Sequence, residues 1–321
     1  IWIYMSTGTT SDTTLTLSNI PIQIDLSDEA RNSGLQIFSG AEQTASVTVT
    51  GSRATLGTMS ESDVTVTAAA NTINSSGSYS LPVSATKTNP SSNFQITSAV
   101  TPSNINVVVD YLRESSFQIQ ENVVYKVSDG YYASTSLATK SIVISGPQTE
   151  ISKIDKVSAT AEINGTLTDS STTDAEIVLY DSSGNELSTD LLTMDFDKVK
   201  ATVSVLPEKT VSVKPTFTNK PSGLEITDDM ISVEPSTILL AGNKDILEKT
   251  DSVNLEAIDF SNLKNEKITF DALGIDIPTD CKNISNSTTA KVTLDLSGFT
   301  TKKFTVDNFT VKGLSDKYKS E

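Results

Sequence analysis

The chain has 321 residues, enough for two or three domains of ordinary size. Its 24 Lys and Arg against 40 Asp and Glu give a formal net charge of −16, and so acidic a surface opposes binding to nucleic acid. The absence of histidine excludes catalytic triads and zinc sites that need an imidazole, and the single cysteine, Cys281, excludes an intramolecular disulfide.

The first five residues, Ile1 to Met5, are apolar, and a polar stretch over residues 6–14 follows them. Five residues are too few to cross a bilayer, which takes about 20. Trp and Tyr are nevertheless enriched where a transmembrane helix meets the membrane interface, and Trp2 and Tyr4 fit that pattern. Two interpretations stay open for these residues. They are either the first strand of a domain or the outer end of a membrane helix that the sequence does not include.

Alternating strand patterns recur along the chain, and three of them end in a glycine at nearly equal spacing. The glycines are Gly51, Gly146 and Gly242, which are 95 and 96 residues apart. After each glycine we expect a single-turn helix and then another alternating strand. Glycines at matching repeat positions are predicted to adopt positive φ in tight turns. Replacing one of these three with Val should then destabilise its domain by at least about 1 kcal/mol.

A second set of glycines, Gly34, Gly130 and Gly223, stands at the start of the strands that lead to these turns. The two sets keep the same phase, which indicates an internal repeat.

The repeat pattern predicts three domains, at residues 13–112, 113–207 and 208–301. Residues 302–321 read as the start of a truncated fourth repeat, and residues 1–12 as the remnant of a membrane anchor with its linker. Val and Ile alternate with Thr and Ser, which together number 89. Inward Val and Ile would build each core while Thr and Ser face water. The predicted fold class is therefore all-β, with no long amphipathic helix.

Candidate chemical sites are few. Pairs of acidic residues are interpreted as solvated turn residues, because a glycosidase needs two carboxylates facing one cleft. Residues 181–186 offer oxygen ligands but lack the spacing of a calcium loop, and residues 169–174 read as a polar hairpin tip. Lys282 could lower the pKa of Cys281, but we favour a half-buried structural thiol. We therefore expect no enzymatic activity, no catalytic residue, no metal site and no cofactor.

The third repeat carries a motif in six pieces: Gly223-Leu224-Glu225-Ile226, Val233-Glu234-Pro235-Ser236-Thr237-Ile238, Gly242, Ile246, Val253-Asn254-Leu255-Glu256-Ala257 and Asp259-Phe260-Ser261. The second repeat adds a turn at Gly146-Pro147, where the other repeats have Ser52 and Asn243 in place of the proline. With three copies in phase, this signature resembles the YbbR domain family.

The resemblance implies a tandem array of small β-domains, each made of crossed, intertwined hairpins and together forming an elongated chain. It makes Gly51, Gly146, Pro147 and Gly242 structural repeat turns. YbbR proteins of Gram-positive bacteria typically carry one N-terminal transmembrane helix, with the domains outside the cell. In this family they regulate the membrane diadenylate cyclase, which makes cyclic di-AMP. The helix often ends in a Trp-x-Tyr-like stretch, to which residues 2–4 are similar.

The first functional hypothesis that follows is a non-enzymatic, single-pass membrane regulator. It would contact the membrane diadenylate cyclase through the missing helix and the repeat at 13–112. Its outer repeats would bind a component of the cell envelope. The alternative is a structural or adhesive surface module of Ig-like β-domains, in which the repeats supply reach. A polysaccharide-active enzyme is the third class.

Overall fold

The computed structural model describes residues 12–300 and residue 305. They form a mostly β structure with a few short helices, which confirms the predicted fold class. Trp2, Tyr4 and, apart from residue 305, the stretch predicted to start a fourth repeat lie outside the described residues. In the part of the chain that is described, no helix has both the length and the apolar character needed to cross a membrane.

Contacts divide the described residues into two compact units, and each is described by itself. The first unit consists of residues 12–124, 135–163 and 172–202, and the second of residues 125–134, 164–171 and 203–300. Buried apolar side chains form three separate clusters, which lie within residues 17–109, 119–201 and 211–296. The first two clusters belong to the first unit and the third cluster belongs to the second unit.

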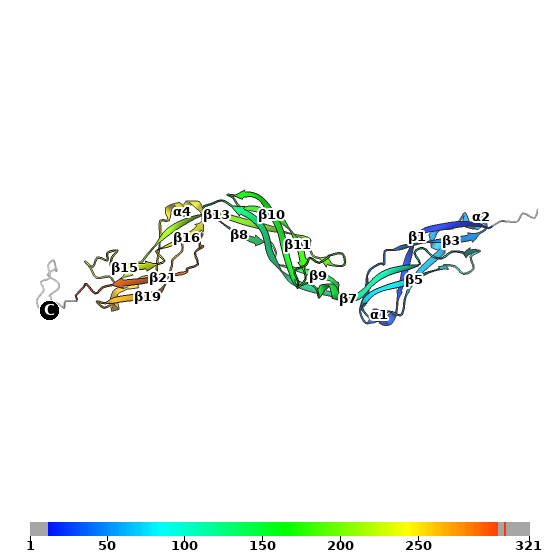
Figure 1. Ribbon diagram of the computed structural model, residues 1–321, viewed down its shortest axis with the longest axis horizontal. Helices are drawn as coiled ribbons and strands as arrows, with labels where there is room; N and C mark the ends of the chain where they lie inside the picture. The colour runs from blue at the N-terminus through cyan, green and yellow to red at the C-terminus, as the bar shows by residue number, and fades with distance from the viewer. Residues whose placement is uncertain (1–11, 301–304, 306–321) are drawn as a thin grey trace, which may run out of the picture. The chain divides into compact units, whose positions relative to one another are not determined.

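The first cluster is built around a long strand that changes partners. The elements are β1 (Thr13–Leu26), α1 (Asp28–Asn32), β2 (Leu35–Ser39), β3 (Thr44–Gly51), α2 (Arg53–Leu56), the 3-10 helix η1 (Glu61–Asp63), β4 (Val64–Ala70), β5 (Gly77–Lys87), β6 (Phe94–Ile96) and β7 (Asn104–Val127). The first half of β1 pairs antiparallel with β3 and the second half pairs parallel with β4. The irregularity between Leu17 and Ile20 contains Asn19 at φ +61°, a conformation that asparagine tolerates. Figure 1 shows β1, β3 and β5 together in the blue and cyan part of the ribbon.

The second cluster uses the later half of β7. Its further elements are β8 (Tyr131–Leu137), β9 (Ser141–Pro147), α3 (Gln148–Ile151), β10 (Lys156–Leu167), β11 (Ser171–Tyr180), β12 (Thr193–Met194) and β13 (Lys198–Lys214). β7 pairs antiparallel with β9 from Leu112 opposite Pro147 to Gln118 opposite Ser141. β10 and β11 form a second antiparallel pair, and β12 pairs with β9.

The second unit repeats the change of partners seen in β1. β13 pairs antiparallel with β16 and then parallel with β17. The elements are β14 (Phe217–Thr218), β15 (Ile231–Glu234), β16 (Thr237–Gly242), α4 (Lys244–Lys249), β17 (Ser252–Asn254), β18 (Ile258–Asp259), the 3-10 helix η2 (Phe260–Asn262), β19 (Lys267–Gly274), β20 (Cys281–Asn283) and β21 (Thr289–Asp295). β21 lies between β15 and β19 and is antiparallel to both. An edge-to-face pair of Phe217 and Phe260, with ring centroids 5.4 Å apart, lies in the third cluster.

Two long strands each supply side chains to two clusters. β7 gives Ile105 to the first cluster and Ile119 to the second. β13 gives Val199 to the second cluster and Val211 to the third. The predicted seams between repeats fall within these two strands, so the backbone passes from one repeat to the next inside a hydrogen-bonded strand. The predicted domain boundaries themselves stay a prediction.

Gly51, Gly146 and Gly242 do not have the positive φ that we predicted for matching repeat positions. Each lies at the end of a strand, or one residue before it, and a short helix follows, as expected. The space around two of them explains the glycine. A Cβ on Gly146 would lie 2.8 Å from the carbonyl oxygen of Leu191, and a Cβ on Gly242 would lie 2.7 Å from that of Asp280. At these two positions glycine is required because another segment of backbone passes close by.

The second set of repeat glycines carries the positive φ instead. φ is +93° at Gly34, +82° at Gly130 and +84° at Gly223. A Cβ at the last two positions would meet nothing within 4 Å, so the backbone conformation alone favours glycine there. The two sets of glycines therefore serve different physical purposes at their repeated positions.

Candidate functional site

One charged side chain within residues 12–300 is buried, and it lies where β7 leaves the first cluster. Asp110 has 2% of its surface exposed and directly follows Val109, the last buried residue of that cluster. Burying a carboxylate is costly unless hydrogen bonds replace its lost water. Its contacts therefore identify the strongest polar constraint in this part of the molecule.

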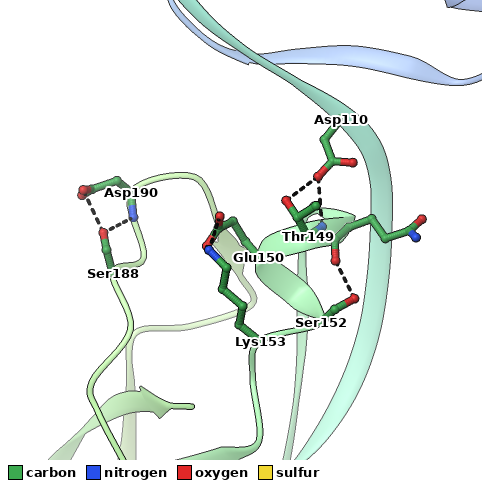
Figure 2. Close-up of polar contacts among 8 residues, drawn as sticks. Asp110, Thr149, Glu150, Ser152, Lys153, Ser188 and Asp190 are labelled. Atoms are coloured by element: carbon green, nitrogen blue, oxygen red, sulfur yellow. Dashed lines mark hydrogen bonds and ion pairs between the residues drawn. The ribbon is translucent and has the colours of Figure 1, made fainter. Parts of the chain in front are cut away.

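Hydrogen bonds from two residues satisfy this carboxylate. Oδ2 of Asp110 accepts from the backbone N–H of Thr149 at 2.9 Å and from its hydroxyl at 2.6 Å, as Figure 2 shows. Oδ1 accepts from the N–H of Tyr111 at 2.7 Å. Burial raises the pKa of Asp110, but the hydrogen bonds from Thr149 and Tyr111 outweigh it, so the pKa lies below its ordinary value of 3.8. The carboxylate is therefore charged at neutral pH.

The contact supplies a helix cap that α3 cannot make for itself. α2 follows Ser52, whose hydroxyl accepts from the N–H of Thr55 at 3.2 Å. α4 follows Asn243, whose side chain accepts from the N–H of Asp245 at 2.9 Å. α3 follows Pro147, whose side chain has no acceptor. For α3 the acceptor comes from β7, in the position that an N-cap side chain would fill.

Strand pairing brings β7 to the start of α3. Leu112 of β7 stands opposite Pro147 of β9, and Arg113 stands opposite Gly146. This register places Asp110 two residues before the first pair, next to the first turn of α3. The last strand of the first cluster and the first helix of the second are thus held together by both backbone and side-chain bonds.

The other polar contacts around α3 lie at the surface. Nζ of Lys153, just after α3, lies 2.8 Å from Oε1 of Glu150 in that helix, and the Ser188 hydroxyl donates to Asp190 at 2.8 Å (Figure 2). Exposed pairs of this kind stabilise a protein by only about 0–1 kcal/mol. The part-buried contact between the buried Asp110 carboxylate and Thr149 is therefore the one expected to dominate this junction.

Cys281 lies half-buried in β20 and packs against the third cluster. Burial and the neighbouring Asp280 carboxylate raise the pKa of the thiol above its ordinary value of 9.0. The suggestion that Lys282 lowers this pKa is wrong. Nζ of Lys282 instead lies 3.0 Å from the hydroxyl of Tyr132 and 5.1 Å from its ring centroid. The thiol is a poor nucleophile at neutral pH.

The carboxylate of Asp181 is occupied by its own turn. It accepts from the side chain of Asn185 at 3.0 Å and from the N–H groups of Asn185 and Ser183 at 2.9 and 2.8 Å. These bonds lower the pKa of Asp181. Of residues 169–174, predicted to be a hairpin tip, the last four belong to β11, where Asp174 pairs with Lys200 at 2.8 Å. Over the described ranges, no three His, Cys, Asp or Glu side chains gather in a way that could hold a metal ion.

Sequence reasoning missed the pair formed by Asp110 and Thr149. Two signals for it were present in the sequence. One is a lone aspartate inside the apolar run Val107-Val108-Val109-Asp110-Tyr111-Leu112. The other is a proline at position 147, where the other two repeats carry the capping residues Ser52 and Asn243. Each signal is weak, and the register of β7 with β9 is needed to connect them.

Three solved structures are similar to this chain. The YbbR-like protein from Streptococcus pneumoniae TIGR4 is 20% identical, with a TM-score of 0.35 over 62% of this chain and 97% of that chain. The YbbR-like domain of a Listeria monocytogenes protein is 22% identical, with a TM-score of 0.24 over 30% of this chain and 92% of that chain. SuR18C from Streptococcus thermophilus is 18% identical, with a TM-score of 0.24 over 30% of this chain and 86% of that chain. No curated protein matches the chain.

A family model described as YbbR-like protein matches two segments, residues 117–205 and 211–294. The two segments enclose the second and third clusters almost completely, and together they span more than half of the chain. The chain therefore belongs to the YbbR-like protein family.

Proposed function

We propose that this protein is a non-enzymatic regulator of the membrane diadenylate cyclase, anchored in the membrane with its repeats outside the cytoplasm. Membership of the YbbR-like family carries the proposal, because the family resemblance implies this role. Two observations on the described residues support the non-enzymatic part of the proposal. The buried carboxylate of Asp110 stabilises a junction, and the raised pKa of Cys281 makes its thiol a poor nucleophile.

In this proposal the repeats are held at the membrane surface, outside the cytoplasm. The repeat at 13–112 would lie nearest the membrane and contact the cyclase. The outer repeats would bind a component of the cell envelope. The hydrogen bonds between Asp110 and Thr149 would then fix the orientation of the second repeat relative to the first. A force or a ligand that acts on the second repeat would therefore also act on the first.

The proposal is tested by measuring cyclic di-AMP in cells that express the membrane diadenylate cyclase together with the full-length protein. The control lacks the membrane helix and residues 1–12 but keeps the repeats. We expect cyclic di-AMP to change with the anchored protein and to stay at its starting level with the control. Equal cyclic di-AMP in cells with the cyclase alone, with the anchored protein and with the control, at equal amounts of membrane cyclase, would overturn the proposal.

A matched pair of variants tests whether the junction takes part. Asp110→Asn removes the buried charge, while Asp190→Asn changes an exposed acid in a nearby turn. If the second repeat acts through the first, Asp110→Asn should weaken the change in cyclic di-AMP and Asp190→Asn should not. Equal effects of the two variants, with both proteins present at parental levels, would argue against transmission through this junction.

A structural surface module is the second candidate, and one feature favours it. β7 runs through two clusters without a break, so it joins the first two repeats as a continuous hydrogen-bonded strand. Such a connection suits a spacer whose repeats supply reach. This candidate predicts that the repeats alone bind isolated cell walls and that the cyclase is unaffected. Cyclic di-AMP and cell-wall binding, measured on the same anchored protein, separate the two candidates.

A further inference from the structure

Asn164 and Gly165, near the end of β10, form the single Asn-Gly pair of the chain. Asn164 is exposed, and among the described residues no hydrogen bond engages its side-chain amide. Asn185 differs in this respect, because its side chain donates to Asp181 at 3.0 Å. An asparagine side chain without a partner is free to turn toward the backbone beside it.

The backbone at this pair departs from a regular strand. φ of Gly165 is +91°, and a Cβ there would meet nothing within 4 Å. The register of β10 with β11 runs from Lys156 to Thr160, so the pair lies beyond it. A glycine of positive φ inside a strand is typical of a bulge, at which the ladder of hydrogen bonds is interrupted. The site thus combines an exposed amide with an irregular backbone and a following residue that has no side chain.

We propose that Asn164 is a site of spontaneous deamidation, with water as the co-reactant. The backbone nitrogen of Gly165 forms a bond to Cγ of Asn164 and loses its proton to solvent, while the side-chain nitrogen takes up a proton and leaves as ammonia. Water then opens the resulting imide ring at either of its two carbonyl groups. One opening gives aspartate, and the other gives isoaspartate, whose main chain is one carbon longer. Glycine favours the closure of this ring, because a Cβ on the attacking residue would crowd the approach to Cγ.

The conversion alters the end of the β10–β11 hairpin, residues 164–171, which belongs to the second unit. The N–H of Ser128 donates to the carbonyl oxygen of Leu167 at 3.0 Å. The N–H of Val205 donates to the hydroxyl of Ser170 at 2.9 Å. Isoaspartate lengthens the backbone just before both acceptors, and it adds one negative charge. We therefore expect the conversion to weaken these two hydrogen bonds.

The test incubates the folded 321-residue chain at mildly alkaline pH in water enriched in heavy oxygen, and mass spectrometry of its peptides follows each asparagine. Asn74 is the control within the chain. It is exposed, and its side chain also has no hydrogen bond within the described part of the chain, but Ser75 follows it. Asn164→Gln is the matched variant, since its longer side chain closes a ring far less readily.

We expect the peptide that contains Asn164 to take up one heavy oxygen first, with aspartate and isoaspartate both among its products. The peptide that contains Asn74 should keep its mass over the same time, and so should the peptide with Asn164→Gln. The conversion should become faster as pH rises, because the attacking nitrogen must lose its proton.

The effect on the hairpin is measured on the isoaspartate form, which anion exchange separates from the parent by its added charge. Asn164→Asp is the control, because it supplies the charge without lengthening the backbone. We expect the amides of Ser128 and Val205 to exchange hydrogen faster in the isoaspartate form than in Asn164→Asp. Equal exchange in the isoaspartate form and the parent would show that the conversion does not weaken these bonds.

Three results would overturn the proposal itself. The first is conversion of Asn164 in urea but not in the folded chain. β10 also borders β7, and its strand bonds would then be holding the backbone away from ring closure. The second is an equal rate at Asn164 and Asn74, because Gly165 would then play no part. The third is a product that contains aspartate alone, which would indicate direct hydrolysis without an imide.

Discussion

Removing the buried carboxylate of Asp110 should destabilise the junction between the first two clusters by more than an ordinary helix cap. Hydrogen bonds to a charged group stabilise by about 1.5–3 kcal/mol each, against about 0.5–2 kcal/mol for an N-cap side chain. Asp110→Ala loses three such bonds but also relieves the burial of the charge, so we expect a net loss of about 2–4 kcal/mol. Thr149→Val keeps the shape of the side chain and removes one donor, for a loss of about 1.5–3 kcal/mol.

A double-mutant cycle on Asp110 and Thr149 measures the contact itself. The combined loss should fall short of the sum of the single losses by at least about 1 kcal/mol, because the two groups share the bond that each change removes. Hydrogen exchange of the amides in α3 and β9, read by mass spectrometry, places the effect in the structure. Ser52→Ala is the control, since it removes the cap of α2 and leaves α3 intact. Additive losses, or a loss below about 0.5 kcal/mol for Asp110→Ala, would refute the reasoning.

Three further expectations follow from the geometry. Because the folded pKa of Asp110 is lowered, its contribution to stability is complete above about pH 5 and disappears as pH falls through the folded pKa. Acid should therefore reduce the free energy of unfolding more steeply in the parent than in Asp110→Asn, as urea titrations at several pH values would show. Gly146→Ala should destabilise by about 1–3 kcal/mol through overpacking, whereas Gly51→Ala, with neighbours at 3.4 Å or more, should change the urea midpoint little. At pH 8, Cys281 should react with a thiol reagent more slowly in the folded chain than in urea, because the folded thiol is half-buried and its pKa is raised; equal rates would contradict this.

The fold class could be read from the sequence because alternation of Val and Ile with Thr and Ser is a local signal. Thr65 and Thr67 alternate with the fully buried Val64 and Val66 in β4, as the pattern predicts. The conformation of the repeat glycines could not be read in the same way. A positive φ and a close approach of another segment both select glycine, and only the position of Leu191 distinguishes them at Gly146.

The contact made by Asp110 could not be predicted from the sequence for a similar reason. Its partner Thr149 lies 39 residues away, and the register that joins β7 to β9 is set by many side chains at once. A lone aspartate in an apolar strand reads equally well as the end of that strand. The sequence does show a difference between the repeats, because Pro147 occupies the position at which the other two repeats have a capping side chain. Comparing copies within one chain thus shows where a repeat departs from its own pattern.

That difference yields a direct test of why the carboxylate is there. If Asp110 replaces a missing N-cap, then Pro147→Ser should make it partly dispensable, since a serine there can cap α3 as Ser52 caps α2. In the parent we expect Pro147→Ser to have little effect or to destabilise by about 0.4–1 kcal/mol, because the unfolded chain gains freedom.

In the Asp110→Ala background the same change should recover about 0.5–2 kcal/mol, the worth of one N-cap. Pro147→Ala is the matched control, since it frees the unfolded chain equally but supplies no acceptor. If Pro147→Ser changes the free energy of unfolding equally in both backgrounds, then Asp110 and position 147 act independently, and the carboxylate is not a substitute cap. If only the serine variant recovers stability, and only without Asp110, then two residues 37 apart in sequence perform one task, and the second repeat depends on the first for the start of its own helix.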